Sequence, residues 1–302
     1  MSTLFGDSVQ LTDGGMETTL IYHDGIELPD FAAFTVLASD EGRAALAAYY
    51  DAYVSVAEAR GLPIVLDTPT WRASSDWGAR LGYSTGRLAD VNRDAVAFLR
   101  DACAGRTARI VVSGAVGPRG DGYVAGATMS TVDARDYHAP QIEALAAAGV
   151  DLVSAITMTY AEEAAGIAFA AQRARVPVAV SFTVETDGTL PSGQRLADAV
   201  AQVDDETGAA PIHYLVNCAH PTHFGHVLAD APVGRVRGVR VNASSKSHAE
   251  LDASDELDVG DPLELAAEVA GLRGRGADLT VFGGCCGTDH RHIDALAAAL
   301  GH

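Results

Sequence analysis

Three of the four cysteines are placed where they could share one metal ion. Cys218 follows the apolar run YLVN, and Cys285 and Cys286 are adjacent within GGCCG. Adjacent cysteines rarely bridge each other, because that ring strains the peptide bond and the disulfide torsion. The flanking glycines let the backbone turn tightly, so that both sulfurs can face one point. Three thiolates would leave the fourth tetrahedral position of zinc free, as in catalytic zinc sites. The alternative is that Cys218 is a buried residue and the pair is incidental.

The compartment of the protein bears on these cysteines. The first residues, MSTLFGDSVQ, lack the basic and apolar regions of a signal peptide. No apolar run approaches the roughly 20 residues that cross a bilayer. We therefore expect a cytoplasmic protein, in which metal binding or catalysis is a commoner use of cysteine than disulfide formation. Cys103, at the end of an expected helix, is most simply a small buried side chain.

Histidines near the cysteines are competing ligands. His220, His223 and His226 follow Cys218, and His290 and His292 follow the cysteine pair. Residues six positions apart point in different directions on a helix, so the first three cannot all share one face. We expect helix-start or surface roles for these histidines and rank them second as a fourth ligand.

Polar residues in two other segments could bind a substrate. Asp13 precedes two glycines in TDGGMETTL, and Glu17 follows them. Either carboxylate could recognise an ammonium group, although Glu17 could instead favour a helix N-terminus. Thr68 lies in LDTPT, where substrate contact and capping of the following turn are both possible.

Eight short apolar segments predict the strands that must position these residues. They are Val9–Thr12, Pro63–Asp67, Ile110–Ser113, Asp151–Ile156, Val178–Phe182, His213–Asn217, Gly238–Val241 and Leu279–Phe282. Between them, apolar residues recur at three- and four-residue spacing. This spacing predicts helices that include Glu41–Arg60, Arg135–Ala148, Ala161–Arg173, Pro262–Gly274 and His290–Leu300. Gly61, Gly149 and Gly276 fit helix C-terminal caps.

Eight strand-like segments, nearly all followed by a helix, predict a single (β/α)8 TIM barrel that forms one domain over residues 1–302. A doubly wound open sheet would usually carry a G-x-G-x-x-G fingerprint, and none is present. In barrels, catalytic groups collect at the C-terminal ends of the strands. Strands six and eight are two positions apart around the barrel, so Cys218 could reach the cysteine pair. The polar segment Asn242–Pro262 is expected to be a long loop.

The charge of the chain restricts its partners. Lys and Arg number 21 against 40 Asp and Glu, which gives a formal charge of −19. Such a surface repels phosphate backbones and anionic headgroups, so we expect no nucleic acid and no membrane partner. A cationic small molecule would be attracted, but acidic charge is also a common means of staying soluble.

Several motifs together resemble the homocysteine S-methyltransferase family. TDGGMETTL, LDTPTWRAS, SGAVGPRGDGY, YHAPQIEALAAAGVDL, SFTVETDGTLPSGQ, VNCAHP and GGCCGTDHRHI occur in the family's order, from Thr12 to about Leu296. The resemblance implies a zinc-bearing barrel that methylates homocysteine to methionine. It also implies that Cys218, Cys285 and Cys286 hold Zn²⁺. Asp13 matches an acidic residue that contacts the amino acid, Thr68 lies in a segment that lines its pocket, and Asn217 precedes the first ligand.

One departure from the family pattern concerns the substrate. Members commonly carry a glutamate after strand four that binds the substrate ammonium, whereas here Ile156 stands at the apparent position. Loss of that carboxylate would remove a charge-assisted hydrogen bond of about 1.5–3 kcal/mol. Either Glu17 or Glu185 substitutes for it, or the physiological thiol is not homocysteine.

The predicted chemistry is methyl transfer between two small molecules, a thiol and a methyl donor. A free thiol has a pKa near 8.5, whereas a metal-bound thiol is deprotonated and can attack a methyl group on a sulfonium or ammonium donor. Relatives of this length resemble enzymes that use S-methylmethionine or S-adenosylmethionine, with betaine ranked next. A barrel with a redox dithiol and a non-enzymatic zinc- or thiol-binding protein are the other two readings of the sequence.

Overall fold

The chain forms a closed barrel of eight parallel strands in sequence order, in a computed structural model that describes residues 8–254, 256–273 and 278–302. The strands are β1 (Gln10–Thr12), β2 (Ile64–Asp67), β3 (Ile110–Val116), β4 (Leu152–Met158), β5 (Val178–Phe182), β6 (Tyr214–Asn217), β7 (Val236–Val241) and β8 (Val281–Gly284). Pairing of β8 with β1 completes the circle. The predicted (β/α)8 barrel is therefore confirmed.

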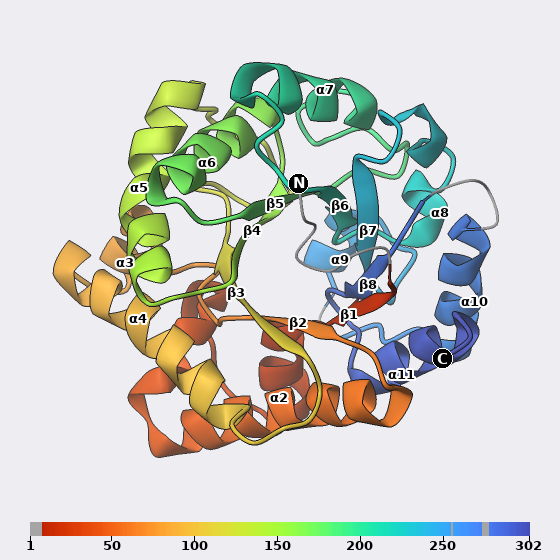
Figure 1. The fold of residues 1–302 in the computed structure, drawn as a ribbon, viewed down its shortest axis with the longest axis horizontal. Coiled ribbons are helices and arrows are strands. Elements are labelled where there is room, and N and C mark those ends of the chain that lie inside the picture. The colour runs from red at the N-terminus through yellow and green to blue at the C-terminus, as the bar shows by residue number, and fades with distance from the viewer. Residues whose placement is uncertain (1–7, 255, 274–277) are drawn as a thin grey trace.

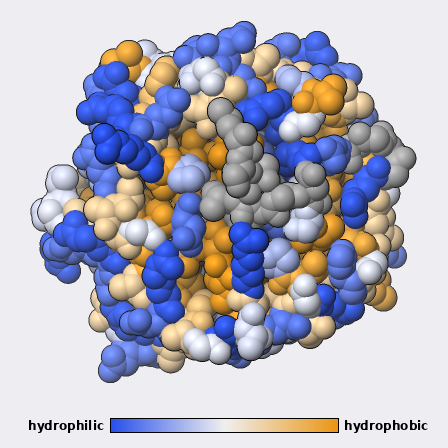
Figure 2. All heavy atoms as spheres, in the orientation of Figure 1, coloured by the Kyte–Doolittle hydropathy of each residue, from blue (hydrophilic) through white to orange (hydrophobic). Residues whose placement is uncertain are grey.

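Helices surround the barrel and cover its outer face (Figure 1). The long ones are α2 (Asp40–Arg60), α4 (Thr85–Ala102), α5 (Thr131–Ala147), α6 (Ala161–Ala174), α7 (Leu196–Thr207), α10 (Pro262–Arg273) and α11 (His290–Ala299). Short helices follow several strands: α1 (Met16–Thr18), α3 (Ser75–Arg80), α8 (Pro221–Phe224) and α9 (His248–Asp252). Hydrophilic residues cover most of the periphery of the face in Figure 2, and hydrophobic residues show between them nearer its centre.

The predicted helix boundaries agree with the structure to within a few residues. Gly61 caps α2 in the left-handed conformation, as expected for a C-terminal glycine. The end of the predicted helix at Gly274 and the cap at Gly276 lie outside the described residues. Across the described part of the chain, no helix combines the length and apolar character of a membrane span.

Some predicted boundaries need correction, and β3 runs three residues beyond its predicted end at Ser113. The predicted loop Asn242–Pro262 contains α9, which begins with a capping box in which Ser247 and Glu250 satisfy each other's backbone N–H groups. Strand β4 runs two residues beyond Ile156, because its pairing with β5 shifts register between Ala155 and Met158. Thr157, inside that irregularity, has a positive φ of 66°.

The strand register determines what fills the barrel. Alternate residues point inward, and the lower layer is apolar, formed by Val65, Val111, Leu152, Ala179, Leu215 and Val281. Two residues further along the strands, the inward positions are Asp67, Ser113, Ser154, Ser181, Asn217, Arg240 and Gly283. The barrel thus has an apolar floor below a polar layer at the C-terminal ends of the strands.

Candidate active site

A cavity of about 260 Å³ opens at the C-terminal ends of the strands. Its walls come from β1, β2, β3, β4, β6, β7 and β8 and the segments that follow them. The lining residues include Asp13, Glu17, Phe31, Asp67, Thr68, Trp71, Arg72, Asp121, Tyr123, Ile156, Thr157, Cys218, Arg240, Asn242, Leu251, Asp252, Asp258, Cys285 and Cys286. An engineered cavity of about 150 Å³ holds benzene, so this one has room for a small organic substrate.

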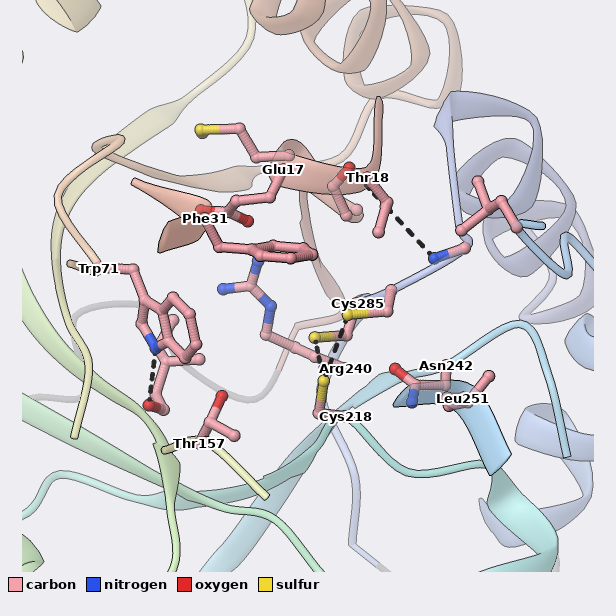
Figure 3. A pocket seen from close by; sticks show the side chains of 18 of the residues that line it. Glu17, Thr18, Phe31, Trp71, Thr157, Cys218, Arg240, Asn242, Leu251 and Cys285 are labelled. Atoms are coloured by element: carbon pink, nitrogen blue, oxygen red, sulfur yellow. Dashed lines mark hydrogen bonds between the residues drawn. The ribbon is translucent and has the colours of Figure 1, made fainter. Parts of the chain in front are cut away.

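The three cysteines predicted as ligands meet at one point in this cavity. The Cys218 sulfur lies 3.0 Å from that of Cys285 and 3.5 Å from that of Cys286. All three sulfurs lie within 4.8 Å of one another, and they are the one such group of Cys, His, Asp and Glu ligands among the described residues. Figure 3 shows the Cys218 and Cys285 side chains converging from β6 and β8.

Glycines before the pair allow this convergence. A Cβ atom on Gly283 would lie 1.8 Å from the Thr12 hydroxyl oxygen, and one on Gly284 would lie 1.9 Å from that of Thr288. A larger residue at position 283 would therefore push β8 away from β1, and one at position 284 would displace the turn that carries Thr288. Cys218 itself adopts a positive φ of 55°, which non-glycine residues adopt at a cost of about 1–3 kcal/mol.

The thiols are electrostatically linked. Hydrogen bonds from Cys218 and Cys286 hold the pKa of the Cys285 thiol well below its usual range. The same contact with Cys285 raises the pKa of Cys218. One sulfur of the group therefore carries negative charge most readily, as a cation-binding site requires.

Tyr123 stands over the sulfurs. Its hydroxyl oxygen lies 3.3 Å from the Cys218 sulfur and 3.5 Å from the Cys286 sulfur. The Tyr123 ring stacks on His248, with ring centroids 4.2 Å apart. His248 in turn donates from Nε2 to the Cys218 carbonyl oxygen at 2.8 Å. Sequence reasoning missed both residues, although Tyr123 ends the quoted motif SGAVGPRGDGY.

The competing histidines lie outside the group of three sulfurs, and His223 departs from the expected helix-start or surface role because it is buried. The His220 ring caps the start of α8 by accepting from the Thr222 N–H. His223 bonds the Ser245 carbonyl oxygen and His226 that of Asp187, so both rings point away from the sulfurs. His292 belongs to the capping box that begins α11.

Asp13 lies on the cavity floor, but it is not free. Arg240 reaches up from β7 and pairs with Asp13 through Nη2 at 2.5 Å and with Asp67 through Nη1. Burial raises the pKa of Asp13 to about 7, while Arg240 opposes that rise. Burial lowers the pKa of Arg240, yet the two carboxylates outweigh it and hold that pKa above its usual range. Two carboxylates and one guanidinium leave a net negative charge when all are ionised.

Sequence reasoning also missed Arg240. An available signal was the charged residue within the apolar run VRGVRV, at an inward position two residues after Gly238. Tyrosines of α2 hold the ends of the first two strands around it. Tyr49 donates to the Gly14 carbonyl oxygen at 3.0 Å, and Tyr50 donates to that of Asp67 at 2.9 Å.

Glu17 faces the cavity from the first turn after β1. Figure 3 shows it beside Phe31, across from Trp71 and Thr157. Burial raises the pKa of Glu17 to about 7, and the nearby Cys285 adds to the rise. Its carboxyl group is therefore present in both protonation states near neutral pH. Of the two acids considered as substitutes for the family glutamate, Glu17 lines the cavity and Glu185 does not. The Glu185 carboxylate lies 3.5 Å from Nδ1 of His248.

Thr68 and Asn217 occupy different depths of the site. The Thr68 hydroxyl lines the cavity, lies 2.7 Å from that of Thr70 and accepts from the Ala115 N–H. Asn217, also a candidate for substrate binding, is fully buried and does not line the cavity. Its Oδ1 accepts from the Thr157 N–H at 3.0 Å, and its Nδ2 donates to the Thr157 hydroxyl at 2.9 Å. Asn217 thus supports the strained Thr157 and the start of the Cys218 loop.

Ile156 lines the cavity where an acidic residue is common in the family pattern. Its carbonyl oxygen accepts from the Trp71 indole N–H at 3.1 Å, so this wall of the cavity is apolar and fixed. Negative charge in the cavity comes instead from Glu17, from the paired Asp13 and Asp67, and from Asp121, Asp252, Glu256 and Asp258 of the same lining.

Comparison with known proteins agrees with this geometry. The family model for homocysteine S-methyltransferase matches residues 10–300. No curated protein sequence matches the chain. The oxidised form of the homocysteine methyltransferase MmuM from Escherichia coli superimposes with a TM-score of 0.78 at 22% identity, over 97% of this chain and 96% of that one. Its metallated form gives a TM-score of 0.74 at 21% identity with the same coverage. The chain belongs to the homocysteine S-methyltransferase family and is a methyltransferase.

Proposed function

We propose that this protein is a zinc-dependent S-methyltransferase that moves a methyl group from S-methylmethionine or S-adenosylmethionine to the thiol of homocysteine, giving methionine. The convergence of Cys218, Cys285 and Cys286 in one cavity is the observation that carries the proposal. We further propose that the reaction belongs to methionine biosynthesis in the cytoplasm.

The donor set fits zinc. Zinc–sulfur bonds of about 2.3 Å in a tetrahedral site place the sulfurs about 3.8 Å apart. The sulfurs here lie 3.0 Å and 3.5 Å from Cys218, so a small outward movement accommodates the ion. Three protein ligands leave a position for substrate. Bound there, zinc would keep a coordinated thiol deprotonated and nucleophilic near neutral pH.

The remaining side chains would bind the two substrates and exclude water. Glu17 and the Asp13–Arg240–Asp67 group supply negative charge for an ammonium group at the cavity floor. Thr68 offers a hydroxyl contact, and Asn217 positions Thr157 from behind. Phe31, Trp71 and Leu251 line the cavity with apolar surface, which favours a desolvated reaction.

The donor is proposed from the charges around the opening. Asp121, Asp252 and Asp258 line the cavity in addition to the floor group, so its field attracts cations. A sulfonium donor carries positive charge on the atom that releases the methyl group. Betaine, a quaternary ammonium donor, is the alternative with the same charge.

The test is a matrix of thiols against methyl donors with zinc-loaded protein. We expect methionine from homocysteine with a sulfonium donor, and about one zinc per chain. Cys285→Ala should lose zinc and lower kcat by more than about 100-fold. Cys103→Ala is the matched control, because Cys103 lies at the end of α4 outside the site. This variant should keep the zinc content and the kcat of the native protein. Absence of methyl transfer for every pair at full zinc loading would contradict the proposal.

A further inference from the structure

One cation that lines the cavity forms no direct ion pair among the described residues. Arg72 follows β2, and only 6% of its surface is exposed. Its guanidinium carbon lies 3.9 Å from the ring centroid of Trp71 and 3.7 Å from that of Trp77, so the two indoles sandwich the group. Nη1 donates to the Gly120 carbonyl oxygen at 2.8 Å. Within the described part of the chain, Nε has no hydrogen-bond partner and no carboxylate lies within ion-pair distance.

Burial of the Arg72 guanidinium without an ion pair costs free energy, and binding of an anion would lower that cost. The two indoles and the Gly120 carbonyl oxygen compensate only part of the lost hydration, so an incoming anion would stabilise the buried guanidinium further. Burial lowers the pKa of Arg72 to about 10, so the group is still charged at neutral pH. Stacking between two rings also fixes the plane of the guanidinium, which pre-organises it for a planar, two-oxygen partner.

We propose that Arg72 binds the carboxylate of a substrate and thereby determines specificity in this cavity. The proposal rests on the methyl-transfer function proposed above. A guanidinium matches the fork of a carboxylate through two parallel hydrogen bonds. The acidic residues Glu17 and Asp121 lie close enough to Arg72 to act on its charge, so a monoanion is favoured over a dianionic phosphate. Both the acceptor homocysteine and the two sulfonium donors carry such a carboxylate.

The arrangement separates the two ends of a substrate. The sulfur end belongs at Cys218, Cys285 and Cys286, and the carboxylate end at Arg72, on another part of the same lining. With Ile156 in place of a glutamate, one contact to the substrate is absent. The contact between Arg72 and the carboxylate contributes binding energy in its place. A thiol without a carboxylate therefore binds more weakly than homocysteine.

The first test uses kinetics of Arg72→Gln. Loss of a charge-assisted bond should raise the KM of the substrate that Arg72 holds by about 10- to 100-fold, with a smaller change in kcat. A rise in the KM of homocysteine assigns the carboxylate to the acceptor, and a rise in the KM of S-methylmethionine assigns it to the donor. If Arg72 holds the acceptor, the carboxylate-free acceptor 3-aminopropane-1-thiol should have the same KM with the native protein and with Arg72→Gln. Unchanged KM values for both carboxylate substrates would overturn the proposal.

Arg80→Gln is the matched control. Arg80 stacks on the other tryptophan of the sandwich, Trp77, at 4.8 Å, and pairs with Asp30 outside the cavity lining. The Arg80→Gln variant should leave the KM values of homocysteine and S-methylmethionine unchanged. If Arg72→Gln folds poorly, Arg72→Lys keeps the charge without the planar fork and should show an intermediate rise in KM.

The second test does not depend on turnover. Trp71 and Trp77 are the only tryptophans in the chain, and both contact Arg72, so intrinsic fluorescence reports on this position. Titration with 4-mercaptobutyrate should give a saturable change that Arg72→Gln abolishes. This result without methyl transfer would sink the proposed function and leave the carboxylate site standing. Methyl transfer with no fluorescence change and no KM effect would sink the carboxylate site alone.

Discussion

At the scale of single residues, the site depends on a buried cation between two buried anions. Arg240 joins Asp13, the residue after β1, to Asp67 at the end of β2, and thereby neutralises part of the charge that the cavity floor would otherwise carry. Such a group contributes little net stability over an apolar replacement, but removal of one member is costly because a charge is left unpaired. Its value here lies in holding the ends of two strands at fixed positions beside the sulfurs.

Arg240→Met should therefore lower the free energy of unfolding by about 3–5 kcal/mol at neutral pH. Arg93→Met is the control from a surface pair. Arg93 pairs with Asp90 on α4, both side chains are exposed, and an exposed pair contributes at most about 1 kcal/mol. Urea unfolding of both variants measures the difference. Equal losses would show that the buried group has no special energetic role.

At the scale of elements, a histidine at the lower end of β6 has a pKa below its usual value. His213 directly precedes β6 and contributes to a small cavity with Val65 and Leu215 at the barrel floor. Burial, together with the charges of Arg237 and Arg235, lowers the pKa of His213 to about 4. The folded barrel therefore favours the neutral imidazole at this position.

This shift predicts a pH dependence of stability with a defined sign. Between pH 6.5 and pH 4 the unfolded chain binds a proton at His213 that the folded chain does not. The free energy of unfolding therefore falls as the pH falls through this window, by up to about 1.4 kcal/mol per pH unit from this group. His213→Gln should show a shallower dependence in chemical unfolding at several pH values. The same slope in both proteins would refute the assignment.

At the scale of the whole molecule, the barrel closes only when β8 pairs with β1, and the cysteine pair follows β8 directly. The three cysteines proposed to hold the metal follow β8 and β6, so we expect barrel closure and assembly of the metal site to occur together. A ligand that binds the folded chain alone stabilises it by mass action. We expect the chain to behave as one domain in which zinc binding and barrel stability are linked.

Metal removal should consequently lower the melting temperature of the whole barrel. Zinc at 100 times its Kd adds about 2.7 kcal/mol to the free energy of unfolding. Far-ultraviolet and near-ultraviolet circular dichroism should report the same single transition with and without a chelator, displaced to lower temperature in its presence. Cys286→Ser should melt at the chelated value under both conditions, whereas Cys103→Ser should respond like the native chain. Two separate transitions would contradict the single-domain assignment.

The sequence by itself determined the strand–helix alternation and the closed barrel, and together with the family resemblance it indicated the three cysteines that meet in the cavity. These follow from local properties: apolar runs, helical spacing and the glycines beside Cys285 and Cys286. It also predicted that Glu17 and Thr68 would reach the cavity, because both closely follow inward strand ends.

Only the tertiary structure decided the partners of these residues. Arg240 pairs with Asp67 and Asp13, which lie 173 and 227 positions away in the sequence. Tyr123, in the segment after β3, stacks on His248 at the start of α9. Arg72 owes its place between two indoles to the path of the loop after β2. Such pairings depend on barrel register and loop path, which pack residues far apart in the chain, and no local pattern of side chains encodes them.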